Sequence, residues 1–144
     1  MNWRRLLLIP IVLAGAASIV ASGPEDNPFK DLQTVSPVTC AAGSIAVTVA
    51  ITTKQSGTDW VTTATGSVTC TSTTPATPLA NVQVGVMWPW KEMGVATTDA
   101  KGNYSITSAK KAGQPSGAAV AGVQPATPAG GTAPAPATAT SNKL

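Results

Sequence analysis

Apolar residues that recur at every second position constrain the fold of this chain more than any other feature. The first such run, residues 44–53 (SIAVTVAITT), places four apolar side chains on one face: Ile45, Val47, Val49 and Ile51. A second run places Val82, Val84 and Val86 on one face. A period of two is typical of a strand with one buried face, and β-branched residues suit such strands. The pattern predicts an all-β fold.

The composition indicates one small domain with a modest core. The chain has 144 residues, of which 10% are charged and 4% are aromatic, whereas ordinary soluble domains are about 25% charged. Val and Ile must therefore supply most of the packing. Arg4 and Arg5 are two of the nine basic residues, and the other seven nearly balance the six acidic ones. Because no basic patch is left, we expect no binding to nucleic acid.

The first 22 residues have the layout of a secretory signal peptide, with a signal helix. A pair of arginines precedes an apolar run at residues 6–20, and small residues follow. Cleavage is expected after Ser22 or after Ser18. The run is shorter than the ~20 residues of a spanning helix, and an uncleaved membrane anchor is the alternative. We therefore expect a secreted, periplasmic or cell-surface protein that contacts a membrane only through an uncleaved signal.

Two cysteines, Cys40 and Cys70, are the only ones in the chain. An exported chain meets oxidising conditions, which favour a disulfide between them. Two separate buried thiols are the alternative. A zinc site is not expected, because the chain has no His and two Cys are too few for a closed site.

The remaining residues divide into a linker at 23–36, a β domain at 37–108 and a tail at 109–144. Strands are predicted at residues 44–53, 60–71, 82–86, 95–98 and 104–107, with Gly66 as a candidate bulge. The tail consists mostly of Ala, Pro, Gly, Thr and Ser, so it is predicted to be disordered. It is interpreted as a spacer with candidate O-glycosylation at Thr127, Thr132, Thr138 and Thr140, or as a segment without a selected role.

Three blocks in the domain resemble a known family. They read Gly66-Ser-Val-Thr, then Pro78-Leu-Ala-Asn-Val-Gln-Val, then Thr97-Thr-Asp-Ala-Lys-Gly-Asn-Tyr-Ser-Ile. Over residues 66–107 the chain is similar to the carboxypeptidase regulatory-like family. This resemblance implies a transthyretin-like (prealbumin-like) fold, which is a small antiparallel β-sandwich of Ig-like type. It covers only the first half of such a domain.

The missing strands are expected from residues 38–53, because an exposed edge in half a sandwich would promote aggregation. Strand addition by another chain is one alternative, and a truncated reading frame is another.

The third block predicts a turn rather than a catalytic site. Asp99 can accept hydrogen bonds from backbone N–H groups two residues on, and Gly102 can adopt a positive φ. Tyr104 then enters the next strand facing the core. We expect structural roles for all three residues, in a hairpin turn between two strands.

No catalytic, metal or cofactor site is expected. Without His the chain lacks the commonest general base, and a Ser-His-Asp or Cys-His arrangement is impossible. Trp88 and Trp90 flank Pro89 in a loop, where they could stack on sugar rings, joined by Trp60. The favoured interpretation is structural: one Trp plugs the end of the sandwich and the other packs on Pro89. We therefore predict an exported, non-enzymatic module with a structural, adhesive or cell-surface interaction role, whose partner is an extracellular protein or, alternatively, a glycan.

Overall fold

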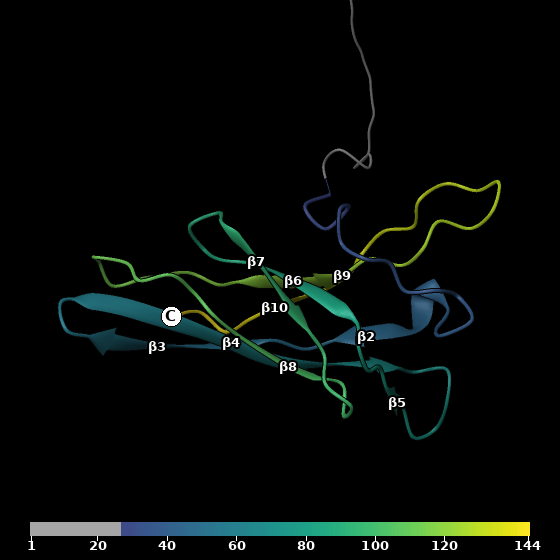
Figure 1. The fold of residues 1–144 in the computed structure, drawn as a ribbon, viewed down its shortest axis with the longest axis horizontal. Coiled ribbons are helices and arrows are strands. Elements are labelled where there is room, and N and C mark those ends of the chain that lie inside the picture. The colour runs from purple at the N-terminus through teal and green to yellow at the C-terminus, as the bar shows by residue number, and fades with distance from the viewer. Residues whose placement is uncertain (1–26) are drawn as a thin grey trace, which may run out of the picture.

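The computed structural model describes residues 27–144, so the predicted signal peptide and its helix lie outside the described residues. In chain order the elements are a short 3-10 helix at Ala42–Ser44, then β2 (Ile45–Val47), β3 (Ala50–Ser56), β4 (Asp59–Cys70), β5 (Thr77–Pro78), β6 (Gln83–Met87), β7 (Met93–Thr97), β8 (Asn103–Thr107), β9 (Val120–Val123) and β10 (Ala137–Thr140). They form two antiparallel sheets that pack together (Figure 1). The predicted all-β sandwich is confirmed.

The long strand β4 is the centre of the first sheet. β2 and β3 pair with one edge of β4, and β5 and β8 pair with the other. Val47 pairs with Val68 and Ala50 pairs with Thr65, three residues further along each strand. The predicted strand at 44–53 is therefore interrupted after Val47 but keeps one register along β4.

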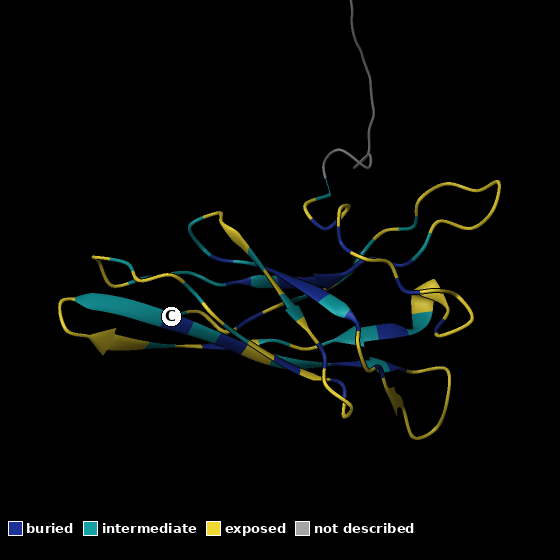
Figure 2. Cartoon of the chain, in the orientation of Figure 1, coloured by how far each residue is buried: buried dark blue, intermediate teal, exposed yellow. Residues whose placement is uncertain are grey.

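The second sheet has the order β10-β9-β6-β7. Its inner face carries Val84, Val86, Ala121 and Val123, all with 0% of their surface exposed. The facing residues of the first sheet include Ile51, Ala64 and Val68, so the core lies between the sheets (Figure 2). As expected from composition, β-branched and small residues fill most of it.

The prediction of a disordered tail at residues 109–144 is wrong. β9 lies between β6 and β10, and Gly122 pairs with Gly85 on one side and Thr138 on the other. Ala119 and Ala121 are fully buried. The tail has few large apolar residues, but a narrow space between two sheets is filled mainly by Ala and Val side chains, and the β6 edge supplies backbone hydrogen bonds.

The sandwich is thus completed from both ends of the domain. β2 and β3 join the first sheet, as expected for the N-terminal strands. β9 and β10 complete the second sheet, and these come from the segment that was expected to be unstructured.

The linker prediction at 23–36 is wrong for its described part, because residues 27–36 pack on the domain. Phe29, Leu32 and Val35 are 2%, 6% and 6% exposed. Val35 N donates to Gln124 O over 2.9 Å, and Ala126 N donates to Val35 O over 2.9 Å. This segment therefore belongs to the domain.

Candidate functional site

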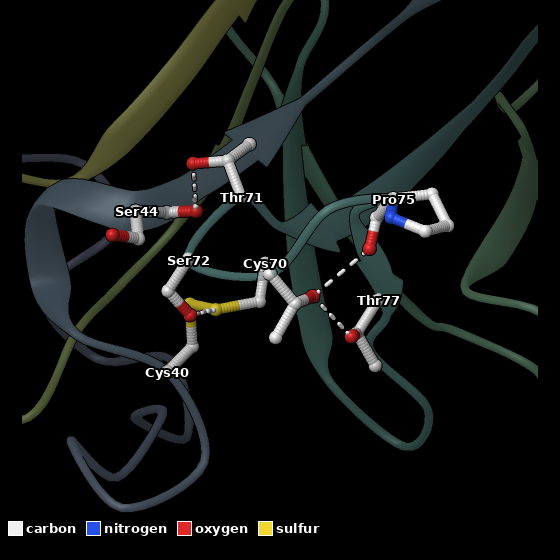
Figure 3. Close-up of a disulfide and its surroundings, with 8 residues drawn as sticks. Cys40, Ser44, Cys70, Thr71, Ser72, Pro75 and Thr77 are labelled. Carbon is white, nitrogen blue, oxygen red and sulfur yellow. Dashed lines mark hydrogen bonds between the residues drawn. A yellow bond between two sulfur atoms is a disulfide. The ribbon is translucent and has the colours of Figure 1, made fainter.

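The disulfide is the first predicted site that the structure confirms. Cys40 and Cys70 are bonded, with Cα atoms 5.8 Å apart, within the usual range for disulfides. The bond ties the segment before β2 to the end of β4, and Ser72 Oγ lies 3.0 Å from Cys70 Sγ (Figure 3). Both cysteines are 3% exposed. A buried disulfide indicates an oxidising, extracellular-type environment.

The turn after β7 has the local geometry that the sequence predicts. Asp99 Oδ1 accepts hydrogen bonds from Lys101 N at 2.9 Å and from Asn103 N at 3.0 Å. Gly102 has a φ of +77°, and its N–H donates to Asp99 O over 3.0 Å. The carboxylate therefore closes a turn, as predicted.

The same turn is not a hairpin, which corrects the prediction. β7 pairs with β6 in the second sheet, whereas β8 pairs with β4 in the first. The Asp99 turn therefore carries the chain from one sheet to the other (Figure 1). Asp99, Gly102 and Tyr104 together define a corner of the sandwich.

Tyr104 faces the core, as predicted, with 4% of its surface exposed. It pairs with Gly66 on β4, and its hydroxyl donates to Thr48 O over 2.6 Å. Burial raises the pKa of Tyr104 to about 12. Gly66 does not form the expected bulge, since the β4 register is continuous past it. Instead, Gly66 admits the close approach of the Thr48 carbonyl and the Tyr104 hydroxyl.

The tryptophan loop is mostly closed to a ligand. Trp88 is 4% exposed and belongs to the core, as the structural interpretation expects of one of the two Trp residues. Trp90 stacks on Trp88, with ring centroids 5.6 Å apart and an interplanar angle of 6°. The two rings therefore cover each other and do not form a flat open platform.

Charged groups complete the surroundings of Trp90. Its indole N–H donates to Glu92 Oε1 over 2.7 Å, and Lys111 Nζ lies 3.0 Å from the same oxygen. Lys111 Nζ also lies over the Trp90 ring, 5.2 Å from its centroid, as in a cation–π contact. The hydrogen bond from Lys111, then that from Trp90, lowers the pKa of the Glu92 carboxyl.

Trp60 is connected to the tryptophan loop by backbone hydrogen bonds to Lys111. Trp60 N donates to Lys111 O over 2.7 Å, and Lys111 N donates to Trp60 O over 2.9 Å. Lys111 thus links the start of β4 to the tryptophan loop. Its role was missed in the sequence because it sits in the segment interpreted as a tail, and no local pattern connects it to Trp60 or Trp90.

A shallow depression lies beside this loop, between β7 and β8. Its lining residues are Trp88, Glu92, Met93, Gly94, Ile106, Thr107, Ser108 and Ala109. Within residues 27–144 no three side chains from His, Cys, Asp and Glu gather closely enough to hold a metal ion. In the same residues no helix is long and apolar enough to cross a membrane.

Comparison with known proteins finds no significant similarity. No family model matches this chain, and no curated protein and no solved structure is significantly similar to it. The resemblance to the carboxypeptidase regulatory-like family therefore stays a prediction.

Proposed function

We propose that this chain is an exported, non-enzymatic β-sandwich module with a structural, adhesive or cell-surface interaction role. The observation that carries the proposal is the buried Cys40–Cys70 disulfide in an all-β fold. Disulfides persist in oxidising compartments, where small β-sandwich domains commonly serve as display and recognition modules. The residues after β7 fit a structural role: Asp99 and Gly102 form a turn, and Tyr104 packs in the core.

Export is tested by mass spectrometry of the protein recovered from each cell fraction. We expect a species outside the cytoplasm that lacks residues 1–22, or 1–18, and that has no alkylatable thiol before reduction. A cytoplasmic species that retains residue 1 and has two reactive thiols would refute the proposal. The adhesive role is then tested by comparing surface attachment of cells with and without the chain, using the Cys40→Ala, Cys70→Ala double variant as a second comparison.

A second candidate is carbohydrate binding at the tryptophan loop, with Trp90 as the stacking residue. The observation that favours it is the half-buried Trp90 ring, flanked by the Glu92 carboxylate and the Lys111 ammonium at the protein surface. Polar groups beside an aromatic ring suit sugar recognition. Trp88 would act only by stacking on the Trp90 ring, and Trp60 only by holding the backbone of Lys111.

A glycan array separates the two candidates. Binding by the unmutated chain that is lost in Trp90→Ala would support the carbohydrate site. The matched control is Lys54→Ala, an exposed residue on β3. If the unmutated chain binds no glycan on the array, the second candidate fails and the structural role stands alone.

A further inference from the structure

The two sides of the sandwich differ in whether the outer backbone groups of their edge strands are hydrogen-bonded. On one side β10 packs near β2, and Asn142 follows β10. The Asn142 side chain accepts a hydrogen bond from Ile51 N at 2.9 Å and donates one to Ile51 O at 3.0 Å. Asn142 therefore occupies part of the outer edge of β3. Native proteins block exposed strand edges in this way because open edges pair with other chains.

β7 forms the edge of the second sheet on the opposite side, and its outer backbone groups are open. Trp88 N donates to Glu92 O, and Thr98 N donates to Val82 O. Because hydrogen-bonded and non-bonded pairs alternate in an antiparallel ladder, the N–H and C=O groups of Met93, Val95 and Thr97 point away from β6. None of these groups makes a hydrogen bond to another residue in the described range 27–144.

The side chains of β7 do not block this edge. Met93 and Val95 are 38% and 47% exposed, which makes them two of the exposed large apolar residues of the molecule. The strand reads Met-Gly-Val-Ala-Thr, without charge and without Pro. The depression between β7 and β8 leaves open space beside it. β10, in contrast, begins directly after Pro136, and β3 carries Lys54.

We propose that two copies of this chain associate through β7, which pairs antiparallel with the β7 of the second copy about a two-fold axis at Val95. The outward groups of Val95 then bond to Val95 of the second copy, and those of Met93 bond to Thr97. The four-stranded sheet of each copy continues into that of the other. The exposed Met93 and Val95 side chains become neighbours across the new ladder.

The charges at the ends of β7 favour this register. Pairing about Val95 brings Lys91, in the turn before β7, near Asp99 of the second copy, in the turn after β7, and both residues are exposed. Pairing about Met93 would place Lys91 opposite Val95, and pairing about Thr97 would place Asp99 opposite Val95. Pairing about Gly94 would place Lys91 opposite Thr97, and pairing about Ala96 would place Lys91 opposite Lys101. An axis between two residues would set outward groups against groups already bonded to β6. The Val95 register alone combines three matched pairs with opposite charges at both ends.

Cysteine cross-linking of the full chain tests the register. A hydrogen-bonded antiparallel pair has Cα atoms about 5.5 Å apart, a distance that a disulfide spans. We expect Val95→Cys to form a covalent dimer on mild oxidation, and a mixture of Met93→Cys with Thr97→Cys to cross-link more than either alone. The control is Thr52→Cys, an exposed residue on the outer face of β3. Equal cross-linking of Val95→Cys and Thr52→Cys would overturn the proposal.

Sedimentation and native mass spectrometry test the association itself. The unmutated chain should be a dimer, and Val95→Lys, which places two ammonium groups face to face, should raise the dimer dissociation constant about tenfold or more. Thr52→Lys should leave it unchanged, and circular dichroism confirms that both variants fold. A monomer at all concentrations, or a dimer that folded Val95→Lys leaves intact, would refute the pairing. Association through β7 requires neither export nor glycan binding.

Discussion

Two aromatic side chains pack against glycines on neighbouring strands. Phe29 lies over the cross-strand pair Gly85 and Gly122, where an added Cβ would come within 2.7 Å and 2.5 Å of its ring. Tyr104 pairs with Gly66 in the other sheet. An aromatic ring over a glycine restores the contact surface that the glycine lacks. These contacts fix the N-terminal segment and β8 on the sandwich.

Gly122→Ala should therefore destabilise the protein by about 1–3 kcal/mol, because the new methyl group collides with the Phe29 ring. The free energy of unfolding is measured by urea titration. Gly113→Ala is the matched control, since its added Cβ would meet nothing within 4 Å, and it should change stability by less than about 0.5 kcal/mol. Equal losses in the two variants would contradict the role of the contact between Phe29 and Gly122.

Tyr104 should make the protein sensitive to alkaline pH. Its pKa is about 12 when folded, against about 10 in an unfolded chain. Its contribution to stability is therefore full below about pH 10 and is lost as the pH rises toward 12, since the unfolded state releases the proton first. Tyr104 is the only tyrosine in the chain, so phenolate absorbance reports its pKa directly.

Tyr104→Phe should lose about 1 kcal/mol at neutral pH, because the 2.6 Å hydrogen bond to Thr48 O disappears. Between pH 10 and 12 the variant should lose less stability than the unmutated protein. A phenolate transition near pH 10 in the folded protein would show that the hydroxyl is not buried.

At the scale of elements, β9 has the least expected role. Its sequence, Val-Ala-Gly-Val, has few large side chains, yet it separates β6 from β10 and pairs with both. Without β9 the buried side chains of Val84 and Val86 would become partly exposed. Phe29 would also lose its contact with Gly122. β9 is therefore required for the sandwich.

Deleting residues 117–144 should abolish cooperative unfolding. The stabilisation lost with two strands exceeds the free energy of unfolding of a typical domain, about 5–15 kcal/mol. Thermal circular dichroism provides the measurement. Deleting only residues 129–132, which are exposed in the loop before β10, should preserve the transition. A folded, cooperative deletion variant would show that the segment is dispensable, as a disordered tail would be.

At the scale of the whole molecule, the disulfide anchors the segment before β2 to the end of β4, next to the strand pair Ile45–Cys70. Cys40 and Cys70 are 30 residues apart in sequence, and the bond connects the segment before β2 with the far end of β4. A cross-link restricts the unfolded chain more than the folded one. The bond therefore raises stability without adding a new element to the core.

The Cys40→Ala, Cys70→Ala variant should lose about 3–4 kcal/mol of stability, from the loop-closure estimate for this separation. The denaturant midpoint should fall in the variant, and adding a reducing agent to the unmutated protein should cause a similar shift. The variant itself should not respond to the reducing agent. An unchanged midpoint would contradict a stabilising role for the bond.

The strands and the local turn could be predicted from particular residues. Val82, Val84 and Val86 alternate and are buried, and Asp99 and Gly102 close their turn as their chemistry requires. The pairing of Cys40 with Cys70 was predicted from their number and from the expected export. A buried Trp in the loop was also predicted, but not that it is Trp88, and the contacts of Trp90 with Glu92 and Lys111 were not predicted.

The sequence by itself determined what is local: alternation of apolar residues, turn chemistry and the cysteine pair. Each of these depends on residues a few positions apart or on a simple count. Only the tertiary structure decided which sheet each strand joins, that β7 and β8 separate at the Asp99 turn, and that Phe29 and β9 belong to the domain. The reason is physical: Ala121, Gly122 and Phe29 have weak preferences alone, and they become ordered because a neighbouring sheet supplies hydrogen bonds and a surface of matching shape.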